Sequence, residues 1–436
     1  MARPKKIKEK TKEKTKEKTI DSKALSAIFE LESTFEDTVS AFKPKKTKVE
    51  VISTGSPALD DITMVNGWPR GRIVHLFGPF GGGKTFISMV AAKNALEADP
   101  DNFVIWFDAE NTFEYKWAEN LGIWDPKLYN EETGEDNNRL RVIPVNHGVS
   151  IFERLSGKIR EKKIGKIKQV YKAVPGYVDL IIDGKMKCPL IVLDSLAAIV
   201  PPGEDTSPVG KANIALLSRF LPIEFRRLAT PLYKSGAILM CINQVTTNIG
   251  GWGDEFGFSG GEKLKHWISL NVFVDKVNKK ESKILTIKDK IESIIGQSVK
   301  FVIKKNKFGP YPRSCESKVL TLAGTEHTGK VYNKIGFVDI EEEWIDLGAS
   351  YGIITKGGAW FNYAGESFQG KAKLAVFLKE NPDHLEAIKI GIQEAKIQGA
   401  INDLHVDGEA DVLEQFKKIE ENLEEDEEDN PEEMEE

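Results

Sequence analysis

The fold is decided by the stretch Gly78-Pro79-Phe80-Gly81-Gly82-Gly83-Lys84-Thr85. It fits the pattern GxxxxGK[ST], follows an apolar strand pattern over residues 72–77 and precedes a helical pattern over residues 85–98. Glycines let backbone N–H groups close around phosphate oxygens, and the start of a helix adds a partial positive charge. The pattern predicts a nucleotide site in which Lys84 reaches the β- and γ-phosphates and Thr85 binds Mg²⁺.

A second apolar strand ends in an acid, as such a site requires. Residues 190–193 are all apolar, and Asp194 follows them directly. A carboxylate at the end of a neighbouring strand can hold the water shell of Mg²⁺, although Asp is also a common helix cap. The glycine-rich stretch upstream favours the metal role. Together the two features predict a nucleoside triphosphatase.

Short apolar strands alternate with helical patterns between residues 51 and 325. This alternation is typical of an α/β domain with a mainly parallel sheet. The predicted buried strands cover residues 72–77, 103–107, 140–145, 190–193 and 237–242.

Two insertions and a second unit complete this outline. Residues 125–138 are polar and predict a surface insertion, and the lysine-rich residues 158–187 predict a second, partly ordered one. After residue 329 we expect a smaller α+β unit, with helices over residues 370–381 and 384–395.

Composition excludes several classes of protein. The chain is 40% hydrophobic and 29% charged, so it can bury a large core. Its apolar runs are shorter than the roughly 20 residues that cross a bilayer, and no apolar segment follows the basic N-terminus. The cysteines Cys188, Cys241 and Cys315 lie far apart, which argues against a disulfide framework or a structural zinc site. We therefore expect a soluble intracellular protein with no membrane partner.

The net charge of −6 comes from the two ends of the chain. Residues 1–19 carry nine basic and three acidic side chains, and residues 420–436 carry twelve acidic side chains and no Lys or Arg. Both ends have too few apolar groups to fold by themselves. Between the basic arm and the core, apolar residues in the segment 21–42 recur at spacings near three and four, which predicts an amphipathic helix.

Several motifs follow one another in the order found in the bacterial RecA recombinase family, which this chain resembles over roughly residues 50–400. The core motifs are Ser53-Thr54-Gly55-Ser56, Gly71-Arg72-Ile73-Val74, Phe107-Asp108-Ala109-Glu110, Asp194-Ser195-Leu196-Ala197-Ala198, Ile242-Asn243-Gln244, Gly260-Gly261-Glu262-Lys263-Leu264-Lys265 and Lys305-Asn306-Lys307. The later matches over residues 358–363, 369–372 and 378–382 separate bacterial-type RecA from ring helicases and clock-type ATPases, which share only the core. Divergence and insertions resemble a phage-encoded member more than a bacterial housekeeping copy.

The resemblance implies roles for residues around ATP. Glu110 corresponds to the residue that positions the attacking water, and Gln244 to the sensor of the γ-phosphate. Lys305 and Lys307 resemble paired lysines that reach the ATP of a neighbouring subunit. Two further residues, Glu114 and Trp117, fall where the family contacts adenine, although neither residue type matches.

The resemblance also implies two DNA-binding loops. The first spans residues 201–211, and Arg219 and Arg226 on the following helix match family arginines near the DNA backbone. Seven residues apart, they share one helical face. The second loop spans residues 245–259 and holds three aromatic rings suited to wedging or stacking on bases. These are Trp252, Phe256 and Phe258.

The family pattern predicts an α/β fold with a RecA-like P-loop ATPase core, an N-terminal helix and a small α+β C-terminal domain. The expected parts are a basic disordered arm (1–20), an N-terminal oligomerisation helix and linker (21–50), the ATPase core (51–325), a C-terminal DNA-associated domain (326–403) and an acidic disordered tail (404–436). Where relatives have Phe after the Gly-Gly motif, this chain has His266, which puts the coupling of ATP to DNA in question.

The resulting hypothesis is a DNA-dependent ATPase that uses ATP and Mg²⁺, forms a helical filament on single-stranded DNA and exchanges strands with homologous double-stranded DNA. It would act in the bacterial cytoplasm or in a phage-infected cell, with a single-strand-binding protein and a loader as further candidate partners. Two rivals are a ring helicase with the same core and a non-hydrolysing DNA scaffold. The match over residues 358–371 argues against the first, and intact Lys84, Thr85, Glu110 and Asp194 argue against the second.

Overall fold

The computed structural model describes residues 49–164, 167–204, 216–247, 256–288, 291–326 and 329–405. Several features predicted from the sequence lie outside the described residues. These are the basic arm, the helix over 21–42, most of the first DNA loop, Trp252 and the acidic residues 420–436.

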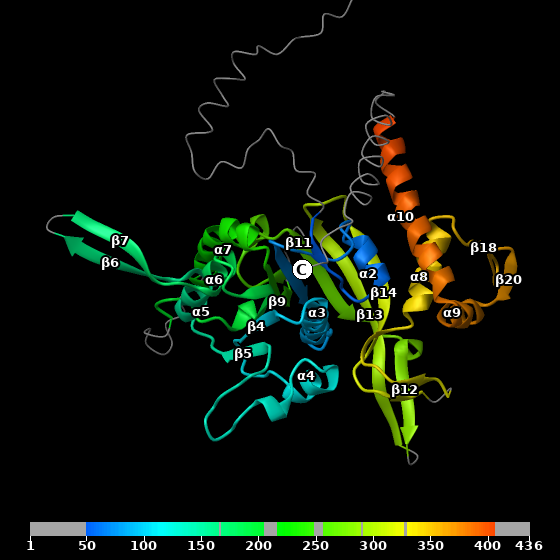
Figure 1. Ribbon diagram of the computed structural model, residues 1–436, viewed down its shortest axis with the longest axis horizontal. Coiled ribbons are helices and arrows are strands. Elements are labelled where there is room, and N and C mark those ends of the chain that lie inside the picture. The colour runs from blue at the N-terminus through cyan, green and yellow to red at the C-terminus, as the bar shows by residue number, and fades with distance from the viewer. Residues whose placement is uncertain are drawn as a thin grey trace, which may run out of the picture. The chain divides into compact units, whose positions relative to one another are not determined.

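A large mixed sheet forms the centre of the fold (Figure 1). Its strand order is β17-β14-β13-β11-β3-β9-β8-β4-β5, and the six strands from β11 to β5 are parallel to one another. The predicted parallel core is therefore confirmed. These strands are β3 (Ile73–Gly78), β4 (Asn102–Asp108), β5 (Leu140–Pro144), β8 (Lys187–Asp194), β9 (Ile238–Thr247) and β11 (Leu270–Lys276).

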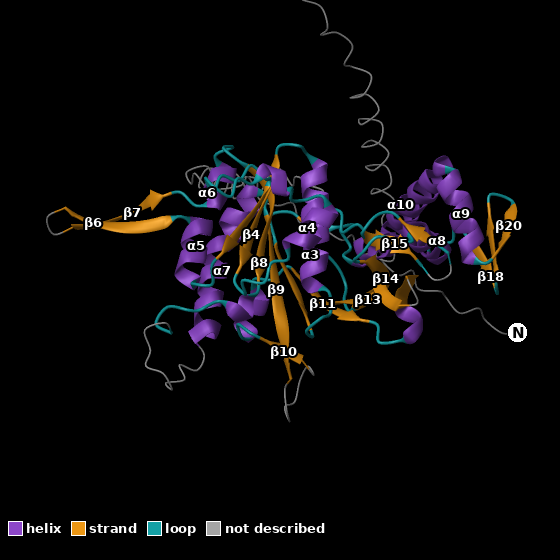
Figure 2. Ribbon diagram, turned by 90° about the horizontal axis from the view of Figure 1, so that it is seen from below, coloured by secondary structure: helices purple, strands orange, loops and turns teal. Residues whose placement is uncertain are grey.

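Helices cover both faces of this sheet, which explains why its strands are apolar without interruption. Alternate residues of β4 enter two separate cores: Trp106 packs on one face and Phe107 on the other. One face is covered by α3 (Lys84–Ala98) and α4 (Tyr115–Leu121), as Figure 2 shows. The other carries α5 (Gly148–Ser156), α6 (Tyr177–Ile182) and α7 (Leu216–Ser235).

Three antiparallel strands extend the sheet beyond β11. They are β13 (Ile291–Asn306), β14 (Arg313–Leu320) and β17 (Gly336–Val338), and β12 (Lys283–Lys288) pairs with the first half of β13. A short helix, α2 (Pro57–Ile62), contacts β14 and begins at Ser56, whose side chain accepts a hydrogen bond from the backbone N–H of Leu59. The sheet thus continues past residue 325.

The two predicted insertions have different structures. Residues 125–138 form a mostly exposed loop with one 3₁₀ turn, Pro126–Leu128. The lysine-rich insertion contains an antiparallel hairpin, β6 (Lys158–Ile164) and β7 (Ile167–Val174), which projects away from the sheet in Figure 1. The sequence predicted partial order there but not this hairpin.

The predicted small α+β unit is confirmed after the last strand of the large sheet. It contains α8 (Ile340–Ser350), a three-stranded antiparallel sheet, α9 (Lys371–Glu380) and α10 (Pro382–His405). The small sheet is formed by β18 (Thr355–Gly357), β19 (Trp360–Tyr363) and β20 (Glu366–Gln369). A separate apolar cluster around Ile345, Phe361 and Leu378 holds this unit together.

A buried acid of α2 joins the small unit to the core. The carboxylate of Asp61 pairs with Arg313 of β14 at 3.1 Å and with Lys396 of α10 at 2.7 Å. It also accepts a hydrogen bond from the hydroxyl of Tyr351. Nearby, Ser56 donates to Glu343 of α8 at 2.7 Å. Charged and polar contacts therefore fix α8 and α10 against the core.

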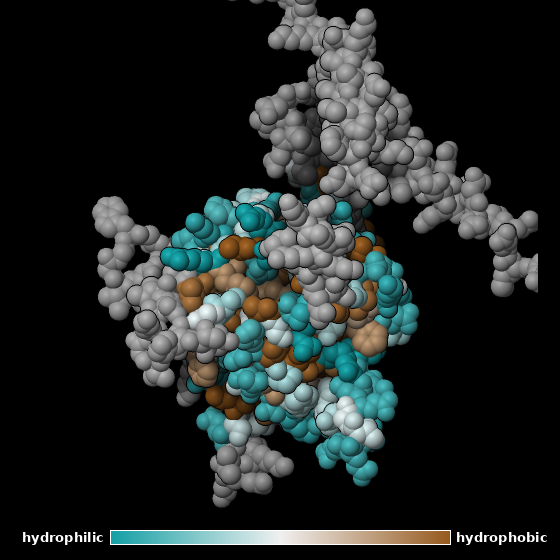
Figure 3. Space-filling view, turned by 90° about the vertical axis from the view of Figure 1, so that its left-hand side faces the viewer, coloured by the Kyte–Doolittle hydropathy of each residue, from teal (hydrophilic) through white to brown (hydrophobic). Residues whose placement is uncertain are grey.

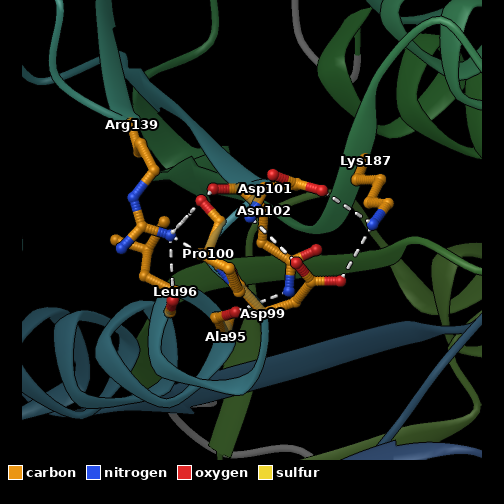
Figure 4. Close-up of polar contacts among 8 residues, drawn as sticks. All are labelled: Ala95, Leu96, Asp99, Pro100, Asp101, Asn102, Arg139 and Lys187. Atoms are coloured by element: carbon orange, nitrogen blue, oxygen red, sulfur yellow. Dashed lines mark hydrogen bonds and ion pairs between the residues drawn. The ribbon is translucent and has the colours of Figure 1, made fainter.

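Arg139 closes the connection between α3 and β4 (Figure 4). Its guanidinium donates to the backbone carbonyls of Leu96, Asp99, Pro100 and Asn102 at 2.9 to 3.3 Å. On the other side of the same turn, Lys187 pairs with the exposed carboxylates of Asp99 and Asp101. This cluster lies at the amino-terminal ends of β4 and β8, away from the glycine-rich loop.

The hydropathy of the surface and the lengths of the helices are consistent with the short apolar runs in the sequence. On the face seen in Figure 3, apolar residues are interspersed with hydrophilic ones among the residues drawn in colour. Within the described ranges, every helix is too short or too polar to cross a membrane.

Candidate nucleotide site and DNA-facing residues

Four neighbouring strands end beside the glycine-rich loop. In the sheet, Gly78 at the end of β3 pairs with Gln244 of β9, and Asp194 at the end of β8 pairs with Asp108 of β4. The carboxyl ends of parallel strands share one edge of a sheet, where open α/β folds bind ligands. The predicted residues Lys84, Thr85, Asp194, Glu110 and Gln244 therefore come together from distant parts of the sequence.

The glycines of the loop are required by its geometry. A Cβ atom on Gly78 would lie 2.0 Å from the carbonyl oxygen of Val274, and one on Gly82 would lie 2.8 Å from the same atom. Gly81 and Gly83 have φ values of 71° and 97°, which side chains disfavour. The loop thus packs against β11 and turns directly into α3. Phe80 lies on it with 89% of its side chain exposed.

Lys84 lies inside the loop that it follows. Its ammonium group donates to the carbonyl oxygens of Gly78 at 2.9 Å and Pro79 at 2.8 Å. Burial lowers the pKa of Lys84, while Asp194 and Glu110 act in the opposite direction. The side chain is a buried cation, which suits the binding of phosphate oxygens.

Thr85 and Asp194 form an oxygen-rich pair beside Lys84. The Thr85 hydroxyl donates to the Asp194 carboxylate at 3.0 Å. Burial, together with the nearby carboxylates of Glu110 and Asp108, raises the pKa of Asp194 to about 7, although Thr85 and Lys84 act in the opposite direction. A divalent cation would relieve this crowding of carboxylates, and Mg²⁺ prefers oxygen ligands. These residues therefore fit a Mg²⁺ site.

Glu110 is exposed and is held by two neighbours. Its Oε1 atom accepts hydrogen bonds from the Ser195 hydroxyl at 2.5 Å and from the Gln244 amide at 3.5 Å. Asp108 closes the turn before it by accepting the backbone N–H groups of Thr112 and Phe113. Neither Ser195 nor Asp108 has a role predicted from the sequence. The sequence signal that could have identified them was their position, because Ser195 directly follows Asp194 and Asp108 lies two residues before Glu110.

The residues predicted to contact adenine lie on α4. Glu114 caps this helix by accepting the backbone N–H of Lys116, and its side chain is exposed. Trp117 is half-buried, with its ring edge-on to Phe86 of α3 at 5.7 Å. Both lie on the helix that follows Glu110, and their contact with adenine stays a prediction.

Lys305 and Lys307 are not part of this cluster. Lys305 donates to the carbonyl oxygen of Lys265, and the backbone N–H of Lys307 donates to the carbonyl oxygen of Ser269. Ser269 precedes β11, whose parallel partner β3 begins at the same edge. The two lysines thus lie at the amino-terminal edge of the sheet, opposite the glycine-rich loop.

Of the DNA-binding candidates, Arg219 and Arg226 are exposed on α7, whose opposite face buries Leu221, Phe225 and Leu228. The ends of the second loop form an antiparallel pair, because β10 (Phe256–Phe258) pairs with β9 up to Thr247. Phe258 is half-buried. Its ring lies 4.6 Å from that of His75 and 5.5 Å from that of Phe77, with the Lys265 ammonium 5.5 Å away. His266 is exposed.

The fold and this site define a P-loop nucleotide-binding protein. The family model of the RecA N-terminal domain matches residues 23–144 and 176–326, and that of the RecA C-terminal domain matches residues 342–396. The chain belongs to the RecA family.

Curated relatives cover most of the chain. A protein RecA from Sulfurovum sp. is 30% identical over 375 residues, which are 85% of this chain and 91% of that protein. A protein RecA from Acidothermus cellulolyticus is 29% identical over 351 residues, or 80% of this chain and 85% of that protein. The resemblance seen in the sequence is confirmed, and with it the function of a DNA recombinase. A phage origin and the domain bounds stay predictions.

Proposed function

We propose that this RecA-family protein binds ATP and Mg²⁺ at the glycine-rich loop, assembles as a helical filament on single-stranded DNA and hydrolyses ATP during strand exchange with a homologous duplex. One observation carries the proposal. Lys84, Thr85, Asp194 and Glu110 converge at adjoining strand ends, in a chain that also matches the RecA C-terminal domain. A ring helicase would share the core but not that domain.

The residues divide the chemistry among them. Thr85 and Asp194 would hold Mg²⁺, which neutralises phosphate charge when bound, and Lys84 would bind the β- and γ-phosphates. Glu110 lies outside this pair but is exposed toward the same edge. As a carboxylate held by Ser195, it can orient a water molecule for attack on the γ-phosphate.

Gln244 offers a connection between the nucleotide and DNA. It contacts Glu110 at the nucleotide edge, and the strand that carries it continues to Thr247 at the base of the second predicted DNA loop. A γ-phosphate that attracts the Gln244 amide would therefore pull directly on that strand. Arg219 and Arg226 would contact DNA phosphates from α7, because both are exposed and seven residues apart.

The test measures ATP hydrolysis with and without single-stranded DNA, and strand exchange between a circular single strand and a homologous linear duplex. We expect DNA to stimulate hydrolysis, and Lys84→Ala to abolish nucleotide binding, hydrolysis and exchange together. Closed rings in electron micrographs, combined with duplex unwinding and no exchange, would favour the helicase instead. The exposed Lys234→Ala variant controls for loss of a surface charge.

A further inference from the structure

A cavity of about 490 Å³ lies at the amino-terminal edge of the sheet, beside Lys307 and opposite the glycine-rich loop of the same chain. Arg72 and Lys307 line it together with the buried residue Ser269 and the rings of Trp267 and Phe308. None of its lining residues is acidic. The cavity is therefore positively charged and walled in part by aromatic side chains.

Arg72 is oriented in this cavity by rings instead of by a carboxylate. Its guanidinium lies 4.8 Å from the centre of the Tyr233 ring and 6.0 Å from that of Phe308. Among the described residues, no acidic side chain pairs with Arg72 or with Lys307. Arg70, two residues earlier, differs: it pairs with Glu50 at 2.7 Å and donates to the carbonyl oxygen of Gly236. The fold neutralises one arginine of this edge and leaves the other available to a ligand.

Three cations, Arg72, Lys307 and Lys305, follow one another along this edge, and within the described ranges none of them pairs with an acidic side chain. Burial lowers the pKa of Lys307, and the nearby Arg72 lowers it further. Burial likewise lowers the pKa of Lys305, and Lys307 adds to that effect. Like charges held together in a partly buried place are unfavourable unless an anion joins them. A ligand with several negative oxygens, such as a polyphosphate, would supply that compensation.

The polyphosphate cannot be the one bound by the same chain. Arg72 precedes β3 and Gly78 ends it, so the six residues of the strand separate them by about 20 Å. A second copy of this chain would present its glycine-rich loop, with Asp194 and Glu110, as a negatively charged edge that complements the three cations. Two different edges of one chain then meet, as in a head-to-tail assembly.

We propose that Arg72 is a third phosphate-binding cation of the interface between copies and that, with Lys305 and Lys307, it contacts the ATP held by the loop of the adjacent copy. This inference rests on the proposed function. Tyr233 and Phe308 hold the guanidinium in place, so that its planar group can bind phosphate oxygens in a bidentate manner.

The first experiment uses full-length Arg72→Gln, with Lys234→Gln as a control that removes a neighbouring exposed charge at the end of α7. We expect Arg72→Gln to bind a fluorescent ATP analogue normally as isolated subunits and to lose at least tenfold of its DNA-stimulated hydrolysis. Lys234→Gln should keep both properties. Arg72→Lys keeps the charge but loses the planar guanidinium, so its DNA-stimulated hydrolysis should lie between those of the other two variants. If Arg72→Gln unfolds at a lower temperature than the wild type, Arg72→Lys is used for the test instead.

The second experiment mixes Arg72→Gln with Glu110→Gln, each of which hydrolyses ATP at a tenth of the wild-type rate or less when alone. In a random filament of equal parts, about a quarter of the interfaces combine an intact Glu110 from one copy with an intact Arg72 from the next. Hydrolysis should therefore return to roughly that fraction of the wild-type rate. No recovery at any ratio would overturn the placement between copies.

Two further results would also refute the inference. Full activity of Arg72→Gln, while wild-type protein shows DNA-stimulated hydrolysis, removes Arg72 from the site but leaves the proposed function intact. A weaker affinity for single-stranded DNA without nucleotide, with a salt dependence reduced by about one phosphate contact, would assign Arg72 to DNA. If the wild-type protein itself lacks DNA-stimulated hydrolysis, the proposed function fails first.

Discussion

At the scale of single residues, the nucleotide site depends on carboxylates with different neighbours. Asp194 is buried beside Thr85, whereas Glu110 is exposed and held by Ser195 and Gln244. The first environment suits a cation and the second a water molecule. From the sequence alone, both acids could be predicted to follow strands. The hydrogen bond from the Ser195 hydroxyl to Glu110 could not be predicted, because it depends on the register of β4 against β8.

We expect Glu110→Gln to bind ATP with wild-type affinity and to lose hydrolysis by about 100-fold or more, the usual contribution of a positioned base. The amide keeps the shape and its hydrogen bonds but cannot accept a proton from water. Single-turnover hydrolysis on single-stranded DNA measures the effect. Glu119→Gln is the control, because Glu119 is an exposed carboxylate on the next helix, α4, with no predicted contact to the nucleotide. Wild-type turnover in Glu110→Gln would remove this residue from the chemistry.

The second prediction at this scale concerns the turn between α3 and β4. Arg139→Ala removes the donor for the carbonyl oxygens of Leu96, Asp99, Pro100 and Asn102, so we expect a loss of about 2 kcal/mol in the free energy of unfolding. Urea denaturation measures it. Lys187→Ala removes only exposed ion pairs of the same turn and should leave the midpoint almost unchanged. Equal effects of the two variants would contradict this assignment.

At the scale of elements, apolar strands were predictable and polar ones were not. The runs in β3, β4 and β8 identified the parallel core, since strands covered on both faces are apolar throughout. The hairpin of β6 and β7 escaped prediction because lysine obscures its alternation. The packing of β11 against the glycine-rich loop was equally hidden, because no local pattern shows that the Val274 carbonyl excludes a side chain at Gly78.

The hairpin offers a clean test of what an inserted element contributes. It lies between the two matched segments of the RecA N-terminal domain, and its strands pair with each other and not with the large sheet. Replacing residues 158–174 with a short Gly-Ser linker should leave the thermal unfolding midpoint and the basal ATP hydrolysis within error of the wild type. A midpoint lowered by several degrees would show that the hairpin supports α5 and α6.

The same deletion decides between the two interpretations of its lysines. Duplex affinity measured across a salt series should be unchanged if they form only a solvated surface. If they contact DNA, the deletion should weaken binding most at low salt and reduce the slope of affinity against salt concentration. Replacing the polar loop 125–138 with a linker of the same kind serves as the control, because that loop is mostly exposed and is not rich in lysine.

At the scale of the whole molecule, the part built on the large sheet and the small α+β unit are joined through polar contacts. Glu343 of α8 is buried at this junction, where one of its oxygens accepts hydrogen bonds from Ser56 and from the backbone of Ala58. Its other oxygen, Oε1, has no partner within the described residues. An ionised Glu343 that is buried with one unpaired oxygen weakens the contact between α8 and the core. The stability of this junction therefore depends on pH.

The sign of that sensitivity follows from the direction of the shift. Burial raises the pKa of Glu343 from 4.5 to about 6, so the folded protein binds more protons than the unfolded chain between these values. Stability contributed by this group therefore increases as pH falls from above 6 toward 4.5, by up to about 2 kcal/mol.

Glu343→Gln should remove this dependence and should be at least as stable as the wild type at pH 8. Urea denaturation at pH 5 and pH 8 measures both effects, and Glu341→Gln, on the same helix but only half-buried, is the control. If Glu343→Gln is less stable than the wild type at pH 8, the ionised carboxylate stabilises the contact between the large-sheet part and the small unit instead of destabilising it.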